Sequence, residues 1–101
     1  MPNIDKIKYY LGDRSLLEQL AEEAAELGKA ALKLIRAAGY NRNVTPVTYE
    51  EAEANLKEEL SDVLMCCIAL GIDILTAEDI ANNPKWERWV KRLEQWETEQ
   101  D

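Results

Sequence analysis

The chain has 101 residues, 47% hydrophobic and 32% charged, which is typical of a single soluble domain covering residues 1–101. Its net charge of −8 argues against a nucleic-acid polymer as partner, because phosphate contacts need a basic surface. No stretch is apolar enough for a membrane span or a signal peptide, so we expect a cytoplasmic protein with no membrane partner. The absence of histidine excludes chemistry that needs imidazole.

The first half of the chain predicts two helices in succession. Apolar spacing favours a short helix over residues 3–11, broken by the glycine that follows. Ser15 and Glu18 then have the spacing of a capping box, in which each side chain satisfies a free N–H group. A long helix over residues 15–38 should follow, and Gly39 supplies its stop.

After a loop over residues 40–47, a second capping box predicts another long helix. Thr48 and Glu51 form this box, and the apolar pattern continues to about residue 70. Cys66 and Cys67 are adjacent, so they diverge on the helix, and we expect reduced thiols packed in the core.

Two further helix starts follow near the carboxyl end. Thr76 and Asp79 predict a short turn of helix, and Asn83-Pro84 has the sequence of an N-cap followed by the first residue of a final helix. No segment alternates with the period of a strand. We therefore predict an all-α antiparallel helical bundle, with apolar faces extensive enough to need completion as a homodimer or homotetramer.

Acidic motifs interrupt both long helices. The first is Glu22-Glu23-x-x-Glu26, and the second is Glu59-x-x-Asp62. Carboxylates three residues apart share a helix face, and helical spacing places Glu23 and Glu59 at the margins of their apolar stripes. The carboxylates of such a cluster repel one another, and burying them costs free energy because charged groups lose their hydration. Two helices relieve this by facing each other across a divalent cation, and Mg²⁺ fits because it prefers oxygen ligands.

The alternative is that these acids only solvate the surface of a non-catalytic helical oligomer with a binding or regulatory role. Charge runs on amphipathic helices are usually solvated faces. We expect this of seven other glutamates along the two later helices: Glu50, Glu51, Glu53, Glu58, Glu94, Glu97 and Glu99. Dependence on metal separates the two interpretations.

The sequence around the two motifs resembles the MazG-like all-α nucleoside triphosphate pyrophosphohydrolases. The family signature is E-E-x-x-E followed, after a spacer, by E-x-x-D, and here it lies in LAEEAAEL (residues 20–27) and LKEELSDVL (residues 56–64). The resemblance extends over residues 9–70. It implies a MazG-like bundle, an oligomer, and Mg²⁺-dependent hydrolysis of nucleoside triphosphates to the monophosphate and pyrophosphate, with Mn²⁺ as a possible substitute.

The resemblance also implies roles for individual residues. Glu22 matches the leading acid, which orients or deprotonates the attacking water. The basic residues that some family members carry after the signature are only approximated here, by Lys85, Arg88, Lys91 and Arg92. Lys29 and Lys33, one turn apart on the first long helix, are alternative candidates for contacts to the substrate phosphates. The positions that match metal ligands are Glu23, Glu26, Glu59 and Asp62. Cleaning of the nucleotide pool is the expected role, and the preferred base and sugar stay open.

Overall fold

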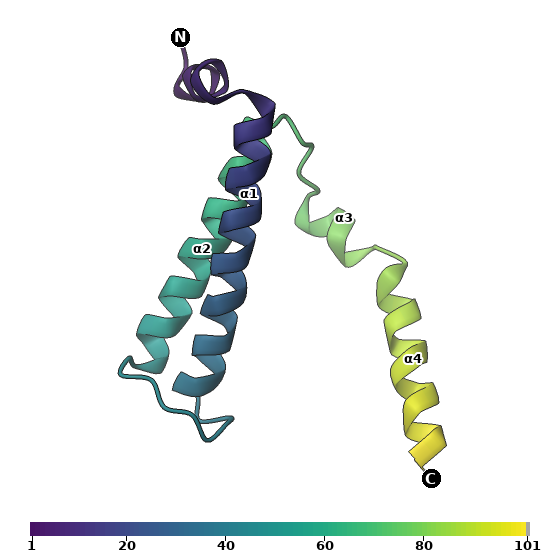
Figure 1. Ribbon diagram of the computed structural model, residues 1–101. Coiled ribbons are helices and arrows are strands. Elements are labelled where there is room, and N and C mark those ends of the chain that lie inside the picture. The colour runs from purple at the N-terminus through teal and green to yellow at the C-terminus, as the bar shows by residue number, and fades with distance from the viewer. Residues whose placement is uncertain (101) are drawn as a thin grey trace.

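The computed structural model describes residues 1–100, and within that range the chain is all-helical, with no strand. It contains four helices (Figure 1): α1 (Asn3–Ala37), α2 (Tyr49–Ala69), α3 (Ala77–Ala81) and α4 (Lys85–Gln100). The predicted all-α class is thus confirmed. No helix within residues 1–100 combines the length and the apolar character needed to cross a membrane.

Gly12 divides α1 into a short first segment and a long second one. Its backbone is non-helical, with φ 72° and ψ 172°, so the predicted break after residue 11 is confirmed. The predicted capping box of Ser15 and Glu18 is wrong, because helical backbone resumes at Asp13 and Ser15 already lies in the first turn. The Glu18 carboxylate instead pairs with Arg14, at 3.4 Å.

The long segment of α1 and α2 form an antiparallel hairpin, which is the main packed unit of the chain (Figure 1). Gly39, at φ 77°, ends α1: its N–H bonds to the Arg36 carbonyl, and the next N–H bonds to the Ile35 carbonyl. This is the Schellman arrangement that glycine permits. The capping box of Thr48 and Glu51 opens α2, as predicted.

The buried core of the hairpin is small. It comprises one leucine, a cysteine and three alanines that let the helices approach closely: Leu16, Ala30, Ala52, Cys66 and Ala69. Other apolar side chains of the two helices are exposed, among them Leu17 and Leu60. These side chains stay exposed because no other helix within residues 1–100 packs extensively against the hairpin.

Helices α3 and α4 form an arm that extends away from the hairpin (Figure 1). The predicted capping box of Thr76 and Asp79 opens α3, and the Asn83 side chain accepts a 2.9 Å hydrogen bond from the N–H of Lys85 at the start of α4. Only α1 and α2 pack extensively against each other. One chain therefore forms a hairpin with an arm, and completion of the predicted bundle by further copies stays a prediction.

Candidate metal centre

Three carboxylates from the two long helices converge on the hairpin. Glu23 of α1 and Glu59 and Asp62 of α2 each offer an oxygen, and these oxygens lie within 4.8 Å of one another. All three side chains are half-buried, as expected for positions at the margin of an apolar stripe. The antiparallel packing of α1 against α2 brings these residues together from distant parts of the sequence.

The electrostatics of this carboxylate cluster are unfavourable without a cation. Burial raises the pKa of the Glu59 carboxyl, and the negative charges of Asp62, Glu23 and Glu26 raise it further. None of the four ion pairs formed within residues 1–100 involves Glu23, Glu59 or Asp62. The cluster therefore concentrates negative charge that the protein itself leaves uncompensated.

Gln19 is a member of the site that the sequence interpretation missed. Its side-chain amide donates a 2.8 Å hydrogen bond to the Glu23 carboxylate from one turn earlier in α1. This contact could have been predicted, because residues at i and i+4 are neighbours on the surface of a helix. The bond orients one oxygen of Glu23 and leaves the carboxylate a second oxygen for a ligand.

The other predicted acids lie at the edge of the cluster or outside it. Glu26 is exposed and receives a 3.3 Å contact from Lys29, although its charge still acts on Glu59. Exposed ion pairs of this kind stabilise little, so a cation can displace Lys29. Glu22 is exposed and does not belong to the group of converging oxygens. The role of Glu26 as a metal ligand and the role of Glu22 in orienting or deprotonating the attacking water stay predictions.

The predicted phosphate contacts lie further along α1. Lys29 is exposed and forms an ion pair with Glu26. Lys33 lies one turn later in α1 and is half-buried. Neither lysine lies inside the group of converging carboxylates. Substrate contacts by these two side chains stay a prediction.

An apolar groove of about 480 Å³ adjoins the carboxylate cluster. Glu23, Asp62 and Gln19 contribute its polar lining, and the first segment of α1 and the carboxyl end of α2 contribute the rest. Burial and the charge of Glu23 raise the pKa of the Cys66 thiol, which also lines this groove. The groove was not predicted, because it depends on the turn at Gly12 that positions the first segment.

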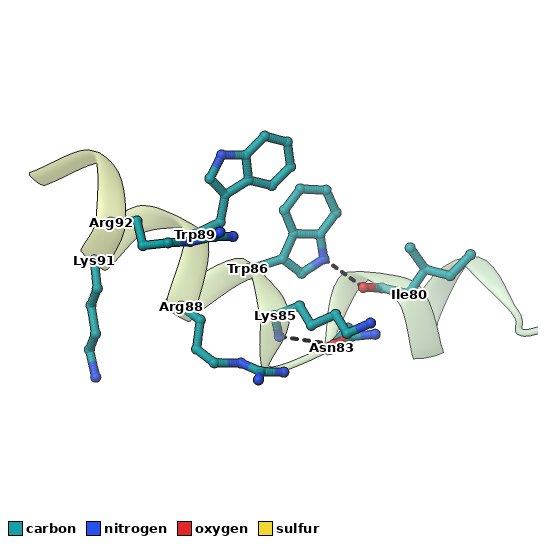
Figure 2. A pocket seen from close by; sticks show the side chains of 8 residues that line it. All are labelled: Ile80, Asn83, Lys85, Trp86, Arg88, Trp89, Lys91 and Arg92. Carbon is teal, nitrogen blue, oxygen red and sulfur yellow. Dashed lines mark hydrogen bonds between the residues drawn. The ribbon is translucent and has the colours of Figure 1, made fainter. Parts of the chain in front are cut away.

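A second cavity, of about 790 Å³, lies at the junction of α3 and α4 (Figure 2). Trp86 and Trp89 stack there with ring centroids 5.9 Å apart, and the Trp86 indole N–H bonds to the Ile80 carbonyl. Arg88 and Lys91 project from the opposite side of the helix. No carboxylate lines this cavity, and it shares no residue with the groove.

Comparison of the chain with protein-family models, with curated proteins and with solved structures finds no match. The kind of metal that the site can bind is therefore judged from the chemistry of its side chains. A half-buried group of three carboxylates with hard oxygen donors fits a divalent cation such as Mg²⁺ or Mn²⁺. The missing imidazole and the poor access of the Cys66 thiol favour these metals over zinc.

Proposed function

We propose that this chain is a MazG-like, Mg²⁺-dependent nucleoside triphosphate pyrophosphohydrolase that acts in cleaning the nucleotide pool. The observation that carries the proposal is the convergence of Glu23, Glu59 and Asp62 from two helices. These are the residues that the acidic motifs single out. Acidic residues that only solvate a surface would not be expected to converge from different helices, because like charges repel and partial burial disfavours the charged form.

The donor set supports binding of a metal that also binds phosphate. Mg²⁺ prefers oxygen ligands and usually completes its shell with waters and substrate phosphates. Glu23, Glu59 and Asp62 would hold the ion, with Glu26 as a fourth ligand once its contact with Lys29 opens. When bound, the ion supplies the positive charge that neutralises the triphosphate and stabilises the departing pyrophosphate.

The remaining residues have separate tasks in the proposed reaction. Water adds to the α-phosphorus, the bond from this phosphorus to the bridging oxygen breaks, and pyrophosphate leaves with that oxygen. Glu22, the leading acid of the first motif, orients the attacking water or accepts its proton, because a carboxylate can act as general base in a chain without histidine. Lys29 and Lys33 contact the phosphates from the next turns of α1.

The direct test is to incubate the purified protein with ordinary, deoxy and modified nucleoside triphosphates, with Mg²⁺ and with excess chelator. We expect monophosphate and pyrophosphate as products, and no turnover with chelator. The products distinguish this activity from release of the terminal phosphate, which gives a diphosphate and inorganic phosphate. A folded protein that releases pyrophosphate from no member of the panel would contradict the proposal and favour a non-catalytic binding protein.

A further inference from the structure

The single chain exposes far more surface than a compact protein of its mass. Its accessible surface is 8399 Å², whereas a compact monomer of 11.6 kDa exposes roughly 5,800 Å². Its radius of gyration is 18.0 Å, against about 13 Å for a compact domain of this length. The excess of roughly 2,600 Å² per chain amounts to roughly 5,200 Å² for two copies, which is at the upper end of the total area that obligate homodimers bury.

Helix α4 exposes one apolar face along most of its length. Its apolar side chains recur at helical spacing on one face and are all at least half exposed, from 50% for Trp86 to 61% for Trp96: Trp86, Trp89, Val90, Leu93 and Trp96. The stacked pair of Trp86 and Trp89 forms a flat aromatic surface on this face (Figure 2). We call these five residues the aromatic face. Three tryptophans left in water are unfavourable, and tryptophan is enriched at protein interfaces.

The apolar groove beside the carboxylate cluster is the matching unpartnered surface on the hairpin. Its exposed side chains come from the first segment of α1 and the end of α2: Ile4, Ile7, Leu11, Met65 and Ile68. Two helices already form its walls. An amphipathic helix lying in the groove would pack against both α1 and α2, as helices do in a bundle.

The charges of the two surfaces are complementary. At about 100° per residue, Lys85 and Arg92 lie within roughly 20° of each other along one border of the aromatic face. Glu23 and Asp62 lie along the lining of the groove. A helix that places its aromatic face in the groove can therefore turn its basic border toward these acids, which favours one orientation over its reverse.

We infer that two copies of the chain associate reciprocally, with the aromatic face of α4 from each copy lying in the apolar groove of the other. The arm of each chain already points away from its own hairpin (Figure 1). The Asn83 cap and the bond from Trp86 to the Ile80 carbonyl hold α3 and α4 together as one unit. Reciprocal exchange gives a two-fold interface that covers both surfaces of both chains. The apolar contact on which this association rests does not depend on whether the carboxylates bind metal.

The mass of the intact protein in solution is the first test. Light scattering coupled to size exclusion should give about twice 11.6 kDa, or an even multiple of the chain mass, over a wide range of concentrations. Trp89→Glu places a charge in the centre of the aromatic face and should yield the monomer. Gln95→Glu, the same charge on the opposite side of α4, should leave the mass unchanged. A wild-type monomer would overturn the inference.

Cross-linking tests which copy supplies the helix. In a background carrying Cys66→Ala and Cys67→Ala, one tagged chain carries Met65→Cys in the groove and a co-expressed chain carries Val90→Cys on α4. Mild oxidation should link the two different chains, since a disulfide forms only when the Cα atoms lie within about 7 Å. Absence of this link in a wild-type-like oligomer would overturn the inference. So would a link formed within one chain that carries both cysteines.

Discussion

Glu23 of α1 and Glu59 of α2 lie face to face across the helical hairpin, with carboxylate oxygens within 4.8 Å and no basic side chain paired with either among residues 1–100. Asp62 adds a third carboxylate to the same place. Folding of the hairpin must therefore bring like charges together, and a bound cation would relieve their repulsion.

Mg²⁺ should raise the melting temperature of the wild-type protein. Binding to the folded state alone stabilises it by about 2.7 kcal/mol at one hundred times the dissociation constant, which corresponds to a shift of about 10 °C or more for a domain of this size. Glu23→Gln removes one ligand and should abolish most of the shift. The measurement is thermal unfolding by circular dichroism at equal protein concentrations, with and without Mg²⁺.

Glu97→Gln is the matched control for this measurement. Glu97 is an exposed glutamate of α4 and is not one of the converging carboxylates. The variant should retain the full response to Mg²⁺. Equal shifts in Glu23→Gln and Glu97→Gln would mean that the ion acts on general surface charge and not on the cluster.

The stability of the metal-free protein should fall as the pH rises through the titration of Glu59. The pKa of Glu59 is raised in the folded state, so the folded protein holds this proton more tightly than the unfolded chain does. Its stabilising contribution is complete below the ordinary glutamate pKa and is lost as the pH rises through the folded-state pKa. Glu59→Gln should weaken this pH dependence and raise the metal-free melting temperature at neutral pH. An unchanged pH dependence in the variant would contradict the assignment.

Helix boundaries were largely predictable from the sequence because local chemistry determines them. Thr48, Thr76 and Asn83 cap helices as predicted, and Gly39 ends α1. The Ser15 prediction failed because Gly12 adopts a positive φ and starts the helix one turn earlier. The glycine turn at Gly12 and the capping box at Ser15 are two alternative signals for the start of the same helix. The local sequence does not show which of the two determines the start.

Part of the candidate site was also predictable. Helical periodicity placed Glu23 and Glu59 at the edge of the apolar stripes, where the structure has them half-buried. The groove was not predictable, because residues 4–11 reach it only through the turn at Gly12. The position of α4 could not be predicted from its amphipathic pattern, since that pattern does not say which surface the helix covers.

Thr48→Ala should lower the free energy of unfolding by about 1 kcal/mol. The Thr48 hydroxyl accepts a 3.2 Å hydrogen bond from the Glu51 N–H, and the Glu51 side chain accepts one from the Thr48 N–H. The substitution leaves the donor at the start of α2 without its partner. Chemical unfolding should show this loss, and Thr48→Ser should restore most of it. A loss of equal size in both variants would contradict a capping role.

Alanine substitutions at two glycines should act in opposite directions. Gly28 lies within α1, and a Cβ atom there meets no atom within 4 Å, so Gly28→Ala should stabilise the protein by about 0.5–1 kcal/mol. Gly39 has φ 77°, where alanine is strained, so Gly39→Ala should destabilise it by about 1 kcal/mol. Urea unfolding of both variants gives the comparison. Stabilisation by Gly39→Ala would contradict the Schellman end of α1.

The most direct test of the central claim is pyrophosphate release by wild-type, Glu59→Gln and Glu97→Gln proteins, each shown to be folded and assayed with saturating Mg²⁺ and the best nucleoside triphosphate. If the carboxylate cluster holds the catalytic ion, Glu59→Gln should lose nearly all turnover, because a neutral amide is a poor ligand for Mg²⁺. Glu97→Gln should match the wild type. Retained turnover in Glu59→Gln, or equal losses in both variants, would contradict the claim.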